Sequence, residues 1–127
     1  MVINTHADVA AYLVARAPAT FAACAAAFTA LCVRAPSLSV SSVLDIGAGP
    51  GTASWAAMEQ WPNIDSIMLV DENRDMLNAA RILCAGADVA ALRDARIECT
   101  QMSGAIAAGS YDLVVASYAM GELPTTD

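Results

Sequence analysis

Three glycines that alternate with small residues form the stretch of this sequence best suited to hold a ligand. Gly47, Gly49 and Gly51 follow a carboxylate, Asp45, near the end of an apolar run. Glycine lets the backbone turn sharply and approach a ligand that any Cβ would push away. The helix expected after the turn presents free N–H groups and a partial positive charge there. A plain structural turn uses the same glycines, so the triplet alone leaves both interpretations open.

The spacing of the glycines separates two classes of nucleotide-like ligand. A dinucleotide-binding turn reads G-x-G-x-x-G, and its third glycine allows close packing over a pyrophosphate. Here the pattern is G-x-G-x-G, and Thr52 stands where the third dinucleotide glycine would be. Asp45 would repel a pyrophosphate but suits a ligand with an ammonium group, such as the methionine part of S-adenosylmethionine. The turn therefore disfavours a nicotinamide cofactor.

A second carboxylate follows the next apolar run. Asp71 comes directly after residues 67–70 and twenty residues past Gly51. In nucleotide-binding α/β folds an acidic side chain at this place accepts hydrogen bonds from ribose hydroxyls. We assign this role to Asp71 first and to Glu72 second. The alternative is a solvated loop charge, or a favourable interaction of Glu72 with the next helix dipole.

The composition bounds the class of protein. With 127 residues the chain is one domain at most, and its net charge is -7, with six cations that are all arginine. Such an acidic chain does not carry a phosphate-neutralising surface of its own, although a local arginine patch is compatible with it.

The cysteines predict no metal site. Cys24, Cys32, Cys84 and Cys99 form no C-x-x-C pair, and the sole histidine is His6. We interpret them as reduced, mostly buried thiols; ligands or disulfides are the alternatives.

One apolar span raises the question of a membrane. Residues 9–33 are rich in apolar side chains but contain Arg16 and Pro18. A central arginine costs about 2.5–3.5 kcal/mol on insertion scales, and no basic region precedes the span. We expect a soluble, cytoplasmic protein.

Strands and helices are expected to alternate after a helical leader. Pro18 should end a first helix that begins near His6, or lie in the first turn of a second one. Asn73 is the expected cap of a later helix and Gly86 its stop. The alternation implies a mainly parallel sheet with right-handed crossovers. Helices are expected at residues 6–16, 18–33, 52–60 and 74–85, a short helix or loop at 88–94, and strands at 42–46, 67–70, 95–100 and 111–117.

Apolar spacing predicts which side chains are buried. We expect one stripe of the second helix, two residues of the third and one face of the fourth to pack inward: Phe21, Cys24, Phe28, Leu31, Cys32; Trp55, Met58; Met76, Leu77, Ala80, Leu83. Arg96 and Glu98 alternate with apolar residues, so the third strand is expected at a sheet edge.

Three blocks resemble consecutive motifs of the class I S-adenosylmethionine-dependent methyltransferases, in their usual order. They are VLDIGAGPGT at 43–52, LVDENRDML at 69–77 and SYDLVVAS at 110–117. More narrowly, AYLVARAPATFAA, VLDIGAGPGTASWAA, DENRDML and SYAMGELP resemble the methyltransferase-like proteins of the small ribosomal subunit, the mitochondrial assembly-factor type and its bacterial relatives.

The resemblance implies S-adenosylmethionine at the carboxyl ends of the strands. The glycine turn with Ala48 would line the methionine part, and Asp45 would support its ammonium group directly or through water. Asp71 would bind the ribose, and Ser117 and Tyr118 would face the methyl group. Asn73, Met76 and Met102 are candidates to flank the adenine, although core packing explains Met76 and Met102 equally well. The expected cofactor residues are Asp45, Gly47, Ala48, Gly49, Gly51, Asp71, Glu72, Met102 and Ser117.

The sequence departs from the family patterns after the expected third and fourth strands, and it stops where the family fold is only half built. Many relatives have an acidic residue for the adenine amino group after the third strand, where only Gln101 or Ser103 could substitute. The fourth strand continues into SYAMGELP and not into an N-P-P-[YF] motif, which argues against methylation of base amino groups. The iron–sulfur cysteine cluster that ribosomal relatives carry downstream is not in this sequence, and we expect no metal.

The resemblance also implies a fold class. It is a Rossmann-like methyltransferase sheet truncated to about four parallel strands in the order 3-2-1-4, with an N-terminal helical extension. We expect the extension at residues 1–36 and the cofactor-binding half-domain at 37–127. The fourth strand would then be an apolar edge, so we expect the chain to self-associate or to be unstable.

Two functions are compatible with these features. The first is the cofactor-binding part of a methyltransferase, linked to ribosomal RNA or the small ribosomal subunit. The alternative is a non-catalytic S-adenosylmethionine-binding factor for ribosome assembly. No catalytic base is identified, and Tyr118 and Glu122 are only candidates. The isolated chain is expected to be inactive in either case.

Overall fold

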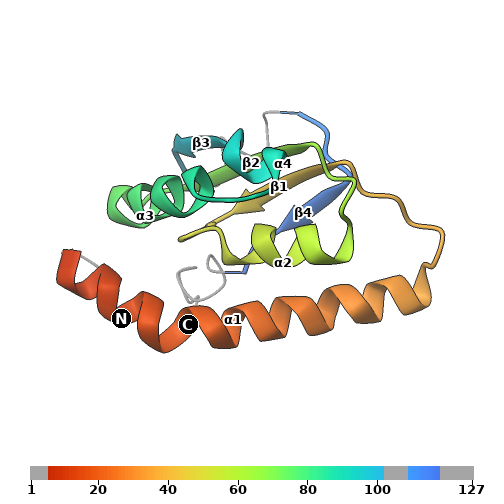
Figure 1. Ribbon diagram of the computed structural model, residues 1–127, viewed down its shortest axis with the longest axis horizontal. Helices are drawn as coiled ribbons and strands as arrows, with labels where there is room; N and C mark the ends of the chain where they lie inside the picture. The colour runs from red at the N-terminus through yellow and green to blue at the C-terminus, as the bar shows by residue number, and fades with distance from the viewer. Residues whose placement is uncertain (1–5, 102–108, 118–127) are drawn as a thin grey trace, which may run out of the picture.

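A four-stranded parallel sheet organises the computed structural model, which describes residues 6–101 and 109–117 (Figure 1). Its strands are β1 (Ser42–Ile46), β2 (Ser66–Asp71), β3 (Arg96–Cys99) and β4 (Leu113–Val115), in the order β3-β2-β1-β4. The predicted fold class and strand order are confirmed. β3 and β4 are shorter than the stretches 95–100 and 111–117 that the sequence predicted.

The register of the sheet brings two carboxylates to the same edge. Asp45 pairs with Leu69 of β2 and with Val115 of β4, and Asp71 pairs with Cys99 of β3. Because parallel strands all end at one edge, the ends of β1 and β2 lie side by side there.

Three helices follow the strands. They are α2 (Thr52–Gln60), α3 (Arg74–Ala85) and the single turn α4 (Ala90–Arg93). The bounds of α2 and α3 agree with the prediction. Asn73 caps α3 as expected, because its side-chain oxygen accepts a hydrogen bond from the backbone N–H of Met76 at 3.1 Å, and Gly86 stands at the end of the helix.

The helices cover one face of the sheet. Val43, Ile67 and Leu69 belong to a core that also contains residues of all the helices, among them Phe28, Ala56, Ala80 and Leu92. The alternate strand residues point to the other face and form a second cluster, which contains no residue of the described helices. Its buried members are Leu44, Ile46, Met68 and Val70.

The N-terminal helix α1 (His6–Arg34) corrects the expectation of two helices. It is continuous over 29 residues and has Pro18 inside it. Proline removes one backbone hydrogen bond and crowds the preceding turn, which bends a helix without always ending it. Figure 1 shows the axis of α1 changing direction between its red first turns and the orange remainder. After the proline, the later turns of α1 pack on α2 and Trp61 through the buried residues Cys24 and Phe28.

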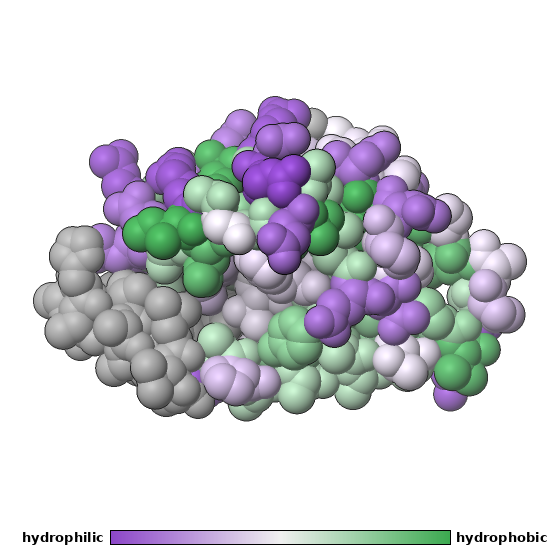
Figure 2. Space-filling model, in the orientation of Figure 1, coloured by the Kyte–Doolittle hydropathy of each residue, from purple (hydrophilic) through white to green (hydrophobic). Residues whose placement is uncertain are grey.

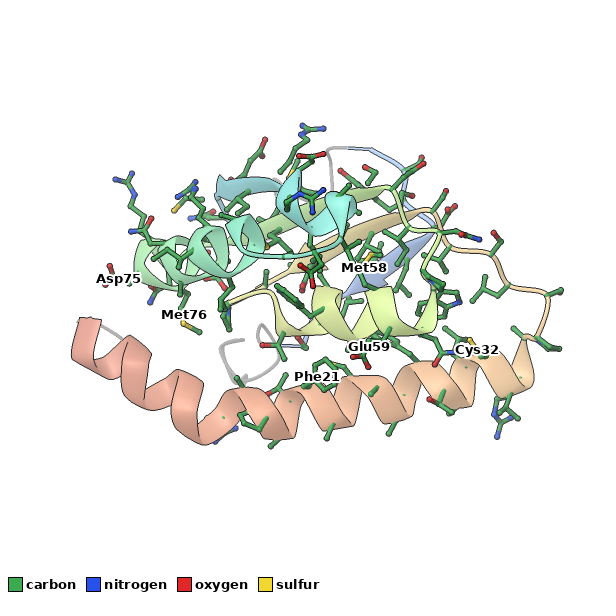
Figure 3. All side chains as sticks on the ribbon, in the orientation of Figure 1. Phe21, Cys32, Met58, Glu59, Asp75 and Met76 are labelled. Carbon is green, nitrogen blue, oxygen red and sulfur yellow. The ribbon has the colours of Figure 1, made fainter. Side chains whose placement is uncertain are left out.

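The buried stripe of α1 is narrower than predicted. Cys24 and Phe28 are buried, and the ring centroids of Phe28 and Trp61 lie 5.2 Å apart. Phe21 and Cys32 point from α1 toward α2, and Met58 points from α2 toward the sheet (Figure 3). The expectation for Leu31 was wrong, since its side chain is 36% exposed.

The predicted face of α3 needs one similar correction. Met76, Leu77 and Ala80 are buried, but Leu83 is 47% exposed. Cys84, one position further on, is buried in its place. Trp55 on α2 is half-buried against the core, as expected.

The outer side of α1 is apolar and largely uncovered. Residues Arg16–Arg34 are long and apolar enough, by length and composition alone, to cross a membrane, and 11% of that window is buried. Figure 2 shows pale green, weakly hydrophobic residues along α1, and purple residues gathered over β3 and α4. A single helix of this kind does not separate a membrane span from a helix that packs on a soluble domain.

The two outer strands of the described sheet differ. β3 carries an exposed pair, Arg96 and Glu98, whose charged atoms lie 3.9 Å apart, as suits the edge position predicted for it. β4 exposes Val114. At the amino end of β4, the Asp112 carboxylate accepts hydrogen bonds from the backbone N–H and the hydroxyl of Ser41, at 2.9 and 2.8 Å. These bonds lower the pKa of Asp112.

Candidate functional site

The turn after β1 needs its glycines. Gly47, Gly49 and Gly51 have φ angles of 61°, 56° and 91°, in the left-handed region that glycine enters without strain. The N–H of Ala48 donates to the carbonyl of Val70 at 2.9 Å, so the turn lies against the end of β2. A Cβ on Gly51 would also lie only 3.3 Å from a methyl carbon of Leu69. The sequence therefore folds locally into a tight turn at the carboxyl edge of the sheet.

Asp71 ties this turn to the next helix. One oxygen, Oδ2, accepts the backbone N–H of Gly49 at 2.8 Å, and the other, Oδ1, accepts the N–H of Asn73 at 2.8 Å. The side chain is 8% exposed. Each carboxylate oxygen has a further lone pair, so the predicted ribose contact stays compatible with these bonds and stays a prediction. The geometry adds a structural role that spacing alone did not predict.

Asp45 ties the same turn to α2. Its Oδ2 accepts the hydroxyl of Ser54 at 2.8 Å, and both side chains are fully buried. The N-cap residue of α2 is Gly51, which makes no side-chain cap. The backbone N–H of Ser54 also acts on the Asp45 carboxylate, so Asp45 on β1 takes the place of a capping side chain at the start of the helix. Its other oxygen, Oδ1, is buried and has no partner among the described residues.

The environment of Asp45 opposes its negative charge. Burial raises its pKa from 3.8 to about 7; the hydroxyl and N–H of Ser54 lower it, and the charge of Asp71 raises it further. Burial also raises the pKa of the Cys24 and Cys84 thiols, and the Asp45 charge adds to both shifts. Among the described residues no cationic side chain pairs with either carboxylate. A ligand with a positive group is therefore favoured at this edge.

The other predicted cofactor residues are placed as follows. The Ser117 hydroxyl, two residues after β4, is buried and lies close enough to the Cys24 thiol of α1 to lower its pKa, although it makes no hydrogen bond of good geometry within the described part of the chain. Glu72 is exposed, and its backbone carbonyl lies 3.4 Å from the Cys99 sulfur. Met102 lies outside the described residues. The structure thus brings together Asp45, Gly47, Ala48, Gly49, Gly51 and Asp71, and does not join the Glu72 side chain to them.

The minor candidates for the adenine and methyl positions divide in the same way. Asn73 is engaged in capping α3. Met76 is buried on that helix, and in Figure 3 it projects on the side of α1. Gln101 is exposed. Ser103, Tyr118 and Glu122 lie outside the described residues.

An apolar cleft of about 380 Å³ lies beside the turn. It opens between α1, the start of α2 and the end of α3 and offers almost no polar surface; its lining is Ala17, Pro18, Phe21, Pro50, Thr52, Trp55 and Leu83. Without charged groups it does not suit the charged part of a nucleotide-like ligand.

Metal chemistry finds no support in the described part of the chain. No three potential ligands among histidine, cysteine and carboxylate side chains gather there. The four cysteines are free thiols: Cys24 and Cys84 are buried, Cys32 is half-buried and Cys99 is exposed.

Sequence reasoning missed Ser54. It is the only polar side chain among the buried residues of α2 after Thr52. A small polar residue among the alanines and Trp55 in the first turns of a helix that follows an aspartate and a glycine turn was the available signal. Its role became visible only when the fold placed it 2.8 Å from Asp45.

Comparison with known proteins gives a family. Residues 6–127 match the family described as mitochondrial small ribosomal subunit Rsm22. A human relative, the mitochondrial ribosome assembly protein METTL17, is 28% identical over 116 residues, which are 90% of this chain and 25% of that protein. The chain thus spans about a quarter of the length of this curated relative.

Solved structures with the same fold are methyltransferases or proteins of that architecture. DesVI of Streptomyces venezuelae is 25% identical with a TM-score of 0.64, over 96% of this chain and 47% of its own. The plantazolicin methyltransferase BpumL, in complex with SAH, is 22% identical with a TM-score of 0.62, over 84% of this chain and 38% of its own. A putative RNA methyltransferase of Pyrococcus horikoshii, PH1948, is 16% identical with a TM-score of 0.53, over 72% and 42%. They confirm the predicted Rossmann-like methyltransferase fold.

The bonds of Asp71 lead to a stability prediction. Asp71→Ala removes two charge-assisted hydrogen bonds and leaves the N–H of Gly49 without its acceptor. We expect the free energy of unfolding to fall by about 2–4 kcal/mol, measured by urea denaturation. The matched control is Glu72→Ala, at the exposed neighbouring carboxylate, which should change stability by no more than about 0.5 kcal/mol. Equal effects of the two substitutions would contradict the structural role of Asp71.

The pKa of Asp45 leads to a prediction on pH. Between its unfolded value of 3.8 and its folded value of about 7, the folded chain holds a proton that the unfolded chain has lost. The contribution of Asp45 to the free energy of unfolding is therefore greatest at low pH. It falls as pH rises through that window, by on the order of 4 kcal/mol in total. Urea unfolding at intervals from pH 4 to 8 measures the slope. Asp45→Asn should flatten it, and an unchanged slope in that variant would be evidence against a buried, titrating Asp45.

Proposed function

The chain belongs to the family described as mitochondrial small ribosomal subunit Rsm22, and from this membership we propose that it is the S-adenosylmethionine-binding part of a methyltransferase-like protein that acts on the small ribosomal subunit. The observation that carries the proposal is the pair of strand-end carboxylates, Asp45 and Asp71, on either side of the glycine turn. The ribosomal part of the proposal draws on the human relative, which is named as a ribosome assembly protein.

The residues present fit this cofactor. Gly47, Ala48 and Gly49 would leave room for the methionine part. The buried, unpartnered oxygen of Asp45 would receive the ammonium group, directly or through water. Asp71 would bind the ribose with the lone pairs that Gly49 and Asn73 leave free. When bound, S-adenosylmethionine supplies an electrophilic methyl group; the bound SAH in BpumL supports this choice of ligand.

In methyl transfer the protein forms no covalent bond to the reactants and mainly positions them. The reaction needs an acceptor placed in line with the sulfonium, in a site that excludes water. Ser117, with its buried hydroxyl at the end of β4, is the described residue that we place nearest the methyl group. A methyltransferase that modifies ribosomal RNA, or another acceptor linked to the small subunit, is the first form of the proposal.

A second form is a non-catalytic assembly factor that uses the cofactor as a structural ligand. Two observations favour it: the human relative is named for assembly, and the segment after β4 reads SYAMGELP, without the N-P-P-[YF] motif of base-amino methyltransferases. Detection of a methylated product would decide for the enzyme.

Several further expectations remain proposals. We propose that residues 1–36 form an extension to a cofactor-binding half-domain at 37–127, and that the chain is cytoplasmic. The packing of α1 on α2 through Phe28 and Cys24 supports a helix associated with the domain.

Titration calorimetry tests the proposed cofactor. We expect the chain to bind S-adenosylmethionine and not NAD, because Asp45 opposes a pyrophosphate. Asp45→Asn removes the charge that the ammonium group meets and should weaken binding about tenfold or more. The control is Asp112→Asn, the same change at the other end of the sheet, which should bind as the unsubstituted chain does. Equal affinity for NAD, or no binding of S-adenosylmethionine by the folded chain, would reject the proposal.

β4 is an outer strand of the described sheet, and this position gives a second test. Strand edges with exposed apolar side chains seek a partner strand, so we propose that the chain self-associates through β4, where Val114 is 56% exposed. Sedimentation velocity should show species above the monomer mass. Val114→Lys should restore a monomer, because lysine at an edge blocks pairing, whereas Val33→Lys on the exposed side of α1 should not. A monodisperse monomer of the unsubstituted chain would refute this expectation.

A further inference from the structure

Ser54 holds one of the two oxygens of Asp45. It is the third residue of α2, fully buried, and its hydroxyl donates to Oδ2 of Asp45 at 2.8 Å. Its backbone N–H also favours the ionised carboxylate. Because both groups belong to the first turn of a helix, the carboxylate is fixed in position relative to α2 and not only to its own strand.

The four carboxylate oxygens at the edge of the sheet are therefore not equivalent. Both oxygens of Asp71 accept backbone N–H groups, those of Gly49 and Asn73. Oδ2 of Asp45 accepts the hydroxyl of Ser54. Oδ1 of Asp45 alone is buried with no partner in the described part of the chain. A buried acceptor that makes no hydrogen bond costs free energy, and a cationic donor satisfies it best.

We propose that Ser54 is a positioning residue of the ligand site: by anchoring Oδ2 of Asp45 to the first turn of α2, it orients the carboxylate so that Oδ1 is the acceptor for the ammonium group of the cofactor. The inference rests on the proposed function, since it names the group of S-adenosylmethionine that Oδ1 meets. Asp45 has no exposed surface, so the residues that cover Oδ1 must shift for the contact to form. Ser54 itself does not touch the cofactor.

Binding should then be coupled to the ionisation of Asp45. Ser54 on α2 and Asp71 on β2 act on this charge, and the charge in turn raises the pKa of the thiols of Cys24 on α1 and Cys84 on α3. Of these, Ser54 is the one that favours the ionised form. Affinity for the cofactor should rise with pH until Asp45 is ionised in the free chain and be constant above that point.

The test compares Ser54→Ala with the unsubstituted chain in two measurements. The first follows the carboxyl ¹³C resonance of Asp45 with pH in the ligand-free chain, assigned by its loss in Asp45→Asn. The midpoint should rise in Ser54→Ala by about one pH unit or more, because a hydrogen bond to the carboxylate is lost. The second measures the affinity for S-adenosylmethionine by calorimetry from pH 6 to 9. Ser54→Ala should bind about fivefold more weakly at pH 7 and nearly as tightly as the unsubstituted chain at pH 9, as a midpoint one unit higher requires.

Ser41→Ala is the matched control. It removes the same kind of bond, a serine hydroxyl to an aspartate Oδ2 at 2.8 Å, at the opposite end of the sheet. Neither the Asp45 midpoint nor the pH profile of binding should change in this variant.

The outcomes separate a failure of this inference from a failure of the proposed function. An Asp45 midpoint that is the same with and without Ser54 would overturn the inference. So would a loss of affinity that is equal at every pH, because it would indicate a merely structural effect of Ser54. If the midpoint moves as expected but the unsubstituted chain binds no S-adenosylmethionine at any pH, the proposed function fails, and with it the ligand named here.

Discussion

Two buried carboxylates at the ends of adjacent strands hold the site together. Asp45 joins β1 to the first turn of α2 through Ser54, and Asp71 joins β2 both to the glycine turn, through Gly49, and to the start of α3. The parallel register of β1 and β2 puts both at one edge of the sheet. The turn is thus fixed from two sides by charged acceptors, and α2 and α3 begin where those acceptors place their first N–H groups.

The burial and charge of these two carboxylates oppose the ionisation of Asp45. Burial opposes the charge of Asp45, the nearby charge of Asp71 opposes it again, and the chain as a whole has a net charge of -7. Ser54 offsets only part of the cost. Strongly perturbed groups of this kind are typical of functional sites, where stability is given up for a ligand. A ligand with a positive group near Asp45 would offset part of this unfavourable charge.

Local signals predicted some elements well and others not. The bounds of β1, α2 and α3 followed from apolar runs, the glycine turn and the Asn73 cap, which act within a few residues of each element. α1 did not follow from Pro18, because its later turns are held by Phe28 against Trp61, a contact between segments far apart in sequence. In the candidate site, too, some features could be predicted from the sequence and others could not. Composition and spacing pointed to Asp45 and Asp71, whereas the hydrogen bonds to Ser54 and Gly49 exist only after the strands and helices have packed.

The same site serves either form of the proposed function, because the fold alone does not decide between catalysis and binding. A methyltransferase and an assembly factor both need the cofactor held at the carboxyl edge by Asp45 and Asp71. They differ at the end of β4, where an enzyme must place an acceptor and an assembly factor need not. For the latter, the ligand would act by linkage: a molecule that binds only the folded chain stabilises it by RT ln(1 + [L]/Kd). Binding would also satisfy Oδ1 of Asp45, the acceptor that the described residues leave unpaired. The cost of burying Asp45 would then make the fold depend on the cofactor, which is the property that a cofactor-responsive assembly factor requires.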